Sequence, residues 1–92
     1  MITAIVHVSA EVSQIPEVAT AIAAIDGVSE VYSVTGPIDL IVLVRVRSHD
    51  DIATVVADKL NKVPGVKDTE THIAFRAYSR HDLEAAFAIG LD

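Results

Sequence analysis

The sequence predicts an α+β fold of the ferredoxin-like kind: a four-stranded antiparallel sheet with two helices on one face. Apolar residues alternate along four segments, as in half-buried strands, and recur at helical spacing along two others. The two helical segments end alike, in Ile25-Asp26-Gly27-Val28 and Val63-Pro64-Gly65-Val66, so the pattern strand-helix-strand occurs twice. Right-handed crossovers within the halves and a hairpin between them then favour the chain order βαββαβ and the strand order 4-1-3-2.

The first half begins with a strand over residues 2–9, because apolar residues alternate there with a mixed set that includes Ile5 and His7. From Ser13 the apolar spacing becomes that of a helix, and Pro16 suits its first turn. This helix is expected to end at Asp26-Gly27.

Two strands, residues 28–35 and 39–47, are expected next, joined by the turn Thr35-Gly36-Pro37-Ile38-Asp39. Residues 40–46 are rich in Val, Ile and Leu, as expected of a central strand that is covered on both faces. Gly36 tolerates a positive φ and Pro37 has no N–H for a ladder, so the turn separates the strands. A polar turn with an acid at its exit, held on a rigid frame, is a candidate ligand site.

The second helix is expected to begin after Ser48, which is a candidate N-cap with Asp51 three residues later. It is expected to end at Pro64-Gly65, and the last strand then runs from Val66 into Phe75 or Ala77.

A short third helix is expected over about residues 79–89, beyond a core of about residues 2–77. Ser79 with Asp82 forms another candidate cap, and Leu83, Ala86 and Phe87 line one side of the segment. Residues 1–92 are therefore expected to form a single domain.

The charge, the hydropathy and the lack of cysteine exclude several classes of function. Thirteen acidic against seven basic residues give a formal net charge of −6, which opposes binding to a phosphate backbone, so no direct nucleic-acid partner is expected. No apolar run approaches the roughly 20 residues of a membrane span, and the N-terminus lacks a basic-then-apolar signal. A cytoplasmic protein without a membrane partner is therefore expected. The absence of cysteine excludes thiolate catalysis and cysteine-ligated metals.

The two helices can cover only one face of the sheet, which leaves Ile5, Ile41 and Leu43 together on the other. An apolar strip of this kind usually marks a subunit interface. We therefore expect these three residues to form an oligomer interface in which two sheets pack back to back.

The turn at residues 35–39, the aliphatic strand after it, the two Gly-Val helix exits and Thr69-Glu70-Thr71 together resemble the effector-binding domain of Lrp/AsnC transcription regulators, known as the RAM domain. The resemblance covers about residues 2–75. It implies the same βαββαβ fold, homodimers that assemble further, often into octamers, and amino-acid effectors bound between dimers. Family regulators carry an N-terminal helix-turn-helix, whereas the first strand here is expected to begin at residue 2. The chain thus resembles a stand-alone effector domain, which implies effector sensing or mixed assembly with full-length regulators.

The resemblance assigns Thr35, Gly36 and Asp39 to the effector site, with Thr71 as a further ligand-binding residue. A free amino acid needs a negative acceptor for its ammonium group and N–H donors for its carboxylate, and Asp39 and the Gly36 turn can supply both. The alternative from the residues alone is that Asp39 merely closes an Asx-type turn and that Gly36 serves backbone geometry.

Neither a metal, a cofactor nor a catalytic site is expected. His7 and His72 are candidate neighbours on the open sheet face, but no His-x-x-His or His-x-x-x-His pair exists. Two interfacial histidines are instead a candidate source of pH-sensitive assembly. Ser79, His81 and Asp82 are sequence neighbours at a predicted cap and do not form a catalytic triad.

Two other functions share the topology. Small monooxygenase-like enzymes form dimeric ferredoxin-like barrels, but they need polar residues facing the helices, where this sequence has almost only Val, Ile, Leu and Ala. ACT-type regulatory modules also bind amino acids but are usually tethered to an enzyme. The sequence therefore favours a non-enzymatic, amino-acid-sensing module that regulates transcription or amino-acid metabolism indirectly, through ligand binding and assembly.

Overall fold

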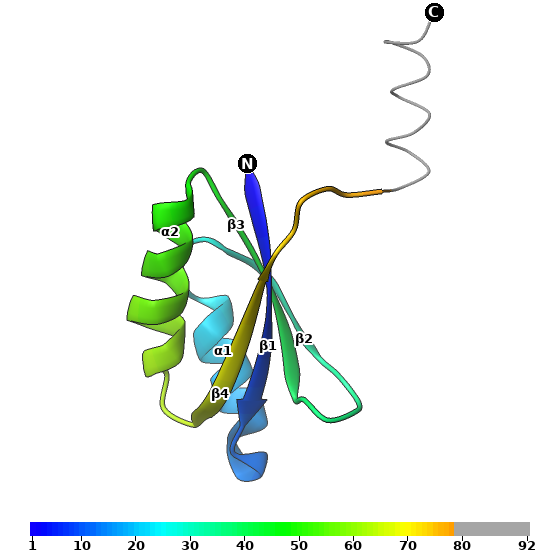
Figure 1. Ribbon diagram of the computed structural model, residues 1–92. Helices are drawn as coiled ribbons and strands as arrows, with labels where there is room; N and C mark the ends of the chain where they lie inside the picture. Colours follow the sequence, from blue (N-terminus) through cyan, green and yellow to red (C-terminus); the bar gives the residue numbers. More distant parts are fainter. Residues whose placement is uncertain (79–92) are drawn as a thin grey trace, which may run out of the picture.

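The computed structural model describes residues 1–78 and has two layers, one of strands and one of helices (Figure 1). The strands and helices follow the order β1 (Ile2–Ala10), α1 (Ile15–Ala23), β2 (Val28–Ser33), β3 (Leu40–Val46), α2 (His49–Ala53) and β4 (Val66–Ile73). A 3₁₀ turn, η1 (Val12–Gln14), precedes α1, and α2 continues as a π-helix, η2 (Thr54–Lys59), and a 3₁₀ turn, η3 (Leu60–Lys62). The predicted helix over residues 79–89 lies outside the described residues.

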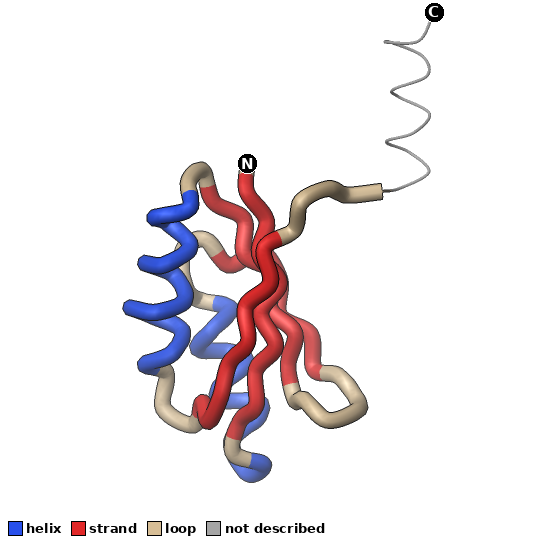
Figure 2. The backbone as a smooth tube through the Cα atoms, viewed as in Figure 1, coloured by secondary structure: helices blue, strands red, loops and turns tan. Residues whose placement is uncertain are grey.

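The sheet has the predicted strand order, β2-β3-β1-β4, with every neighbouring pair antiparallel. Both helices lie on the same side of it, as Figure 2 shows in the blue and red tubes. This confirms the ferredoxin-like βαββαβ fold. No helix within residues 1–78 is long and apolar enough to cross a membrane.

The core lies between the helices and the sheet. Its fully buried side chains come from both layers and are all aliphatic: Ala4, Val6, Val8, Ile22, Leu40, Val42, Val44 and Leu60. Within the described part of the chain, no polar or charged side chain is buried. The buried core on the helix-facing side of the sheet is therefore aliphatic, as the Val, Ile, Leu and Ala content predicts.

The central strand β3 is covered on one face only. Leu40, Val42 and Val44 are buried, whereas Ile41 and Leu43 between them are half-buried and Arg45 is exposed. The expectation that both faces of this strand are covered is wrong for the single chain, because α1 and α2 pack on the same side of the sheet. We call the uncovered side the open face.

Both helix exits depend on glycine. Gly27 and Gly65 each have a φ of +97°, in the left-handed region that favours glycine. A Cβ atom on Gly27 would lie 2.8 Å from Val55 Cγ2, and one on Gly65 would lie 2.7 Å from Val18 Cγ2. The two matching sequences therefore mark places where the backbone turns left-handed directly against a helix.

The second helix begins as predicted and then widens. The Oγ of Ser48 accepts a hydrogen bond from the Asp51 N–H at 3.3 Å, which caps α2. In η2 the turn loosens, and the Leu60 N–H is shared between the carbonyl oxygens of Val55 and Val56. These two successive valines are both buried against the sheet.

Three strands are shorter than predicted, and β3 (Leu40–Val46) loses only one residue at each end of the expected range 39–47. β2 ends at Ser33 instead of Thr35, because the chain leaves the ladder to form the hairpin turn. β4 ends at Ile73 instead of Phe75 or Ala77, since the Ala74 N–H to Thr3 carbonyl bond of 2.9 Å comes near the start of β1. Phe75, one residue later, is 99% exposed.

Candidate functional site

Asp39 ties the hairpin turn to β1. Its N–H donates to the Val8 carbonyl oxygen at 3.0 Å, and its own carbonyl oxygen accepts from the Val34 N–H at 3.1 Å. Its side-chain Oδ2 accepts from the Ala10 N–H at 2.8 Å. The carboxylate thus bonds to the next strand instead of closing an Asx turn in its own loop. Among the hydrogen bonds of residues 1–78, none uses the second oxygen, Oδ1.

Gly36 is required by its backbone angle and not by lack of space. Its φ is +109°, and a Cβ atom built there would meet no atom within 4 Å. Thr35, Gly36 and Pro37 are exposed, whereas Asp39 is half-buried. In a single copy of the chain, the outer side of this turn therefore faces solvent.

Thr71 is not brought to the turn within one chain. It pairs with Val6, whose side chain lies in the helix-facing core, so alternation along β4 directs Thr71 toward the helix side. In addition, β1 lies between β4 and β3. Of the four predicted ligand-binding residues, the structure brings together only Thr35, Gly36 and Asp39.

A polar hollow of about 100 Å³ lies on the open face beside the turn. Its lining combines one turn residue with the ends of β1 and β4: His7, Ser9, Ile38, Asp68, Thr69 and Glu70. Ser9 pairs with Asp68 and His7 pairs with Glu70 across the two strands. Ser9 and Asp68 are not among the predicted site residues, although strand alternation places both on this face once the register is known.

The three predicted interface residues do lie together on the open face. Ile5 pairs with Leu43, and Ile41 is in the neighbouring row, paired with His7 and with Tyr32. All three are half-buried in the single chain, and Tyr32 is 49% exposed. A groove of about 420 Å³ extends the same apolar surface, and its lining includes Ile5, Leu43 and the exposed Phe75. The centre of the open face is therefore apolar.

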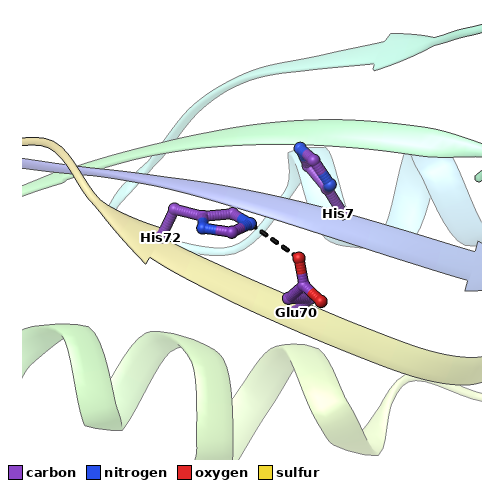
Figure 3. A group of neighbouring side chains, drawn as sticks. All are labelled: His7, Glu70 and His72. Atoms are coloured by element: carbon purple, nitrogen blue, oxygen red, sulfur yellow. Dashed lines mark hydrogen bonds and ion pairs between the residues drawn. The ribbon is translucent and has the colours of Figure 1, made fainter.

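Beside this apolar centre, His7, Glu70 and His72 form a polar cluster (Figure 3). The His72 Nε2 and the Glu70 Oε1 are 2.8 Å apart, and the two imidazole centroids are 5.0 Å apart with a tilt of 59°. One donor atom from each of the three residues lies within 4.8 Å of the others. The expectation that His7 and His72 are neighbours is confirmed, whereas Glu70 was not anticipated.

The opposite edge of the open face, on β2, carries a second polar group. The Arg45 Nη1 lies 3.8 Å from the Glu30 Oε1 and donates to the Ser29 Oγ at 2.8 Å. The Tyr32 hydroxyl donates to the Glu30 Oε2. This hydrogen bond, together with the negative charge of Glu30, raises the pKa of the Tyr32 phenol above its usual value. The apolar centre is thus bordered by ionisable groups on both sides.

Relatives of this chain are transcription regulators that are longer than it. The chain is 44% identical over 59 residues to an HTH-type transcriptional regulator of Pyrococcus horikoshii, a match that covers 64% of this chain and 39% of the relative. It is 40% identical over 73 residues to one of Pyrococcus furiosus, covering 79% of this chain and 49% of the relative. The chain therefore spans between about two fifths and half of these curated relatives.

Solved structures share the fold. The protein TTHA0845 from Thermus thermophilus superposes with a TM-score of 0.82 at 44% identity, covering 87% of this chain and 100% of that one. Two more distant structures, whose likeness concerns the fold alone, are complexes with L-methionine. One is a feast or famine regulatory protein of M. tuberculosis (TM-score 0.71, 24% identity, covering 87% of this chain and 54% of that one). The other is a transcriptional regulator of Neisseria meningitidis (0.76, 18%, covering 86% and 53%).

The family model that matches this chain covers residues 3–83, which include both helices and, apart from Ile2 at the start of β1, all four strands. That model describes an Lrp/AsnC ligand-binding domain. The chain belongs to the Lrp/AsnC ligand-binding domain family.

Proposed function

We propose that this protein is an amino-acid-sensing, oligomer-forming effector domain of the Lrp/AsnC type. The observation that carries the proposal is the hairpin turn, where the half-buried carboxylate of Asp39 and the left-handed Gly36 belong to one short loop fixed to β1. The L-methionine complexes of two proteins with this fold support an α-amino acid as the ligand class.

In this proposal the turn recognises the part that all α-amino acids share. The Asp39 carboxylate accepts from the ammonium group, and Oδ1 is the oxygen assigned to it because Oδ2 is bonded to the Ala10 N–H. Backbone N–H groups around Gly36 donate to the ligand carboxylate, as successive N–H groups do in anion-binding turns. The exposed Thr35 hydroxyl is assigned as a further donor to the ligand carboxylate.

A second copy of the chain is needed to enclose the ligand. Pockets for small ligands measure roughly 300–1,000 Å³ and bury most of the ligand surface. The hollow beside the turn measures only about 100 Å³, and the turn itself is exposed. We therefore assign the opposite wall to a neighbouring copy, which reads the ligand side chain. Thr71, distant from the turn in one chain, is assigned to that neighbouring surface.

Assembly is proposed to begin with the open face. A back-to-back dimer would cover Ile5, Ile41 and Leu43, which otherwise leave an apolar patch in water. Dimers are then proposed to assemble into an octamer-like ring in which the turns meet other copies.

The regulatory role is proposed to be indirect. The net charge of −6 is unfavourable for binding a phosphate backbone, so we propose that the chain influences transcription or amino-acid metabolism by assembling with full-length Lrp/AsnC regulators. Ligand binding would then change the stability of such assemblies.

Calorimetric titration of the twenty amino acids into the wild type and Asp39→Asn tests the ligand proposal. Asparagine keeps an oxygen that accepts from the Ala10 N–H but removes the charge. Loss of a charge-assisted hydrogen bond is expected to weaken binding by about 1.5–3 kcal/mol, roughly 10- to 150-fold. Asp58→Asn, which removes an exposed carboxylate on η2, is the matched control and is expected to bind like the wild type.

Three results would contradict this assignment. Equal affinity of the wild type and Asp39→Asn would remove Asp39 from the site. An equal loss in Asp58→Asn would show a general effect of net charge. Absence of binding by any amino acid would make the chain an assembly partner and not a sensor.

A further inference from the structure

We propose that His7, Glu70 and His72 form a binding site for a divalent transition-metal ion on the open face of the sheet. The site joins two adjacent strands, β1 and β4, and is separate from the amino-acid site proposed at the hairpin turn. It does not depend on the proposed function, because all three ligands come from one copy of the chain.

The strand pairing places the three side chains on one face. His7 and Glu70 are directly paired, so their Cβ atoms are expected about 4.5–5.5 Å apart. His72 lies two residues beyond Glu70 on β4, which makes it a same-face neighbour of Glu70 and a diagonal neighbour of His7. In Figure 3 the three side chains lie close together across the two strands.

The donor atoms are close to the spacing that a metal ion requires. They lie within 4.8 Å of one another. Ligands of a tetrahedral zinc ion, about 2.0–2.1 Å from the metal, lie roughly 3.3 Å apart. The His72 Nε2 and Glu70 Oε1 are already 2.8 Å apart, and their side chains are 52% and 71% exposed in the single chain, so before assembly small rotations can bring the donors around one ion. The ion would replace their mutual hydrogen bond by two metal–ligand bonds.

The chemistry of the donors selects the class of metal. Two imidazoles and one carboxylate suit zinc, cobalt, nickel or copper, whereas calcium and magnesium prefer oxygen ligands alone. Asp68 lines the hollow beside His7 and Glu70 and adds a second negative charge near the site. The remaining coordination positions would be filled by water from this hollow.

The absence of a short histidine motif does not argue against this site. Motifs such as His-x-x-x-His bring ligands together on one helix. Here Glu70 and His72 lie on the same face of β4, and the pairing of β1 with β4 places His7 beside them.

Calorimetric titration of zinc chloride into the tag-free chain of residues 1–92 tests the proposal. One zinc ion per chain is expected to bind the wild type. Loss of a group that only supports a ligand typically lowers metal affinity about 10- to 100-fold, so His7→Gln, Glu70→Gln and His72→Gln are each expected to lower it by about 100-fold or more. His49→Gln, at the exposed start of α2, is the matched control and should leave the affinity unchanged.

Nuclear magnetic resonance of the wild type gives a second readout that needs no variant. Zinc is expected to shift the imidazole signals of His7 and His72 and to leave those of His49 in place. Light scattering on the same samples records the oligomeric mass, so that a failure of assembly is distinguished from a failure of metal binding. Zinc affinity that is equal in the wild type and His72→Gln, or equal shifts of His7 and His49, would overturn the proposal.

Discussion

The two sides of the sheet differ in what they stabilise. On the helix-facing side, Val6, Val42 and Val44 are fully buried, and within residues 1–78 no polar side chain is buried with them. On the open face, Ile41 and Leu43 of the same strand are half-buried, with ionisable side chains on both borders. Alternate residues of β3 therefore differ in role. Val42 and Val44 stabilise the single chain, whereas Ile41 and Leu43 form apolar surface that the single chain leaves partly uncovered.

Substituting lysine at two successive residues of β3 provides the strongest test of this difference. Val42→Lys places an ammonium group in the aliphatic core, at a cost of several kcal/mol, which is comparable to the whole stability of a small domain of about 5–15 kcal/mol. We expect this variant to be largely unfolded, as measured by circular dichroism and by loss of amide dispersion in NMR spectra. Leu43→Lys, one residue later, is expected to keep the fold. A folded Val42→Lys of wild-type stability would contradict the comparison.

The open face is tested next by the oligomeric mass of Leu43→Lys. An unpaired charge in a desolvated interface costs about 3–5 kcal/mol, so the dimer should dissociate at concentrations at least about 100-fold higher than the wild type does. Size exclusion coupled to light scattering measures this. Val12→Lys is the control, because Val12 is 81% exposed and belongs to η1, outside the four strands. A wild-type mass of a single chain would disprove the proposed dimer.

A smaller difference is expected between two glycines. Gly36→Ala should cost roughly 1–2 kcal/mol, because alanine is strained at a positive φ but meets no neighbouring atom. Gly65→Ala carries the same strain, and its Cβ would also lie 2.7 Å from Val18 Cγ2, which adds about 1 kcal/mol or more of overpacking. Chemical denaturation of both variants measures the two free energies of unfolding. Equal losses in the free energy of unfolding would show that the chain at Gly65 moves away from Val18 without a measurable energetic cost.

Much of the fold follows from the sequence by periodicity and by the repeated helix exits. Ser48, Pro16 and the paired glycines act locally, so their roles are visible without a structure. The ends of the strands cannot be located in the same way, because β4 stops where β1 has few residues left to pair with it. The π-helix η2 was also missed, since Val55, Val56 and Leu60 have a spacing that suits an α-helix as well.

The two candidate sites differ in how far the sequence can predict them. The turn at Thr35, Gly36 and Asp39 is continuous in sequence, so turn chemistry and family resemblance were enough to select it. The bond from Ala10 to Asp39 and the cluster of His7, Glu70 and His72 depend on the register between strands that are distant in sequence. Sequence patterning predicts that His7 and His72 are neighbours, but only the register between β1 and β4 shows that Glu70 lies beside them.

The widened turn η2 has a consequence for how this domain tolerates changes in length. Deleting one residue from an ordinary helix rotates everything beyond it by about 100° and moves buried side chains toward solvent. A π-turn already contains one residue more than an α-turn, so deleting the exposed Ala57 would convert η2 to a regular helix. Ile52 and Leu60 would then keep facing the sheet, and the exit at Gly65 would stay in place. Single-residue gaps among related chains are therefore expected to gather in this one turn.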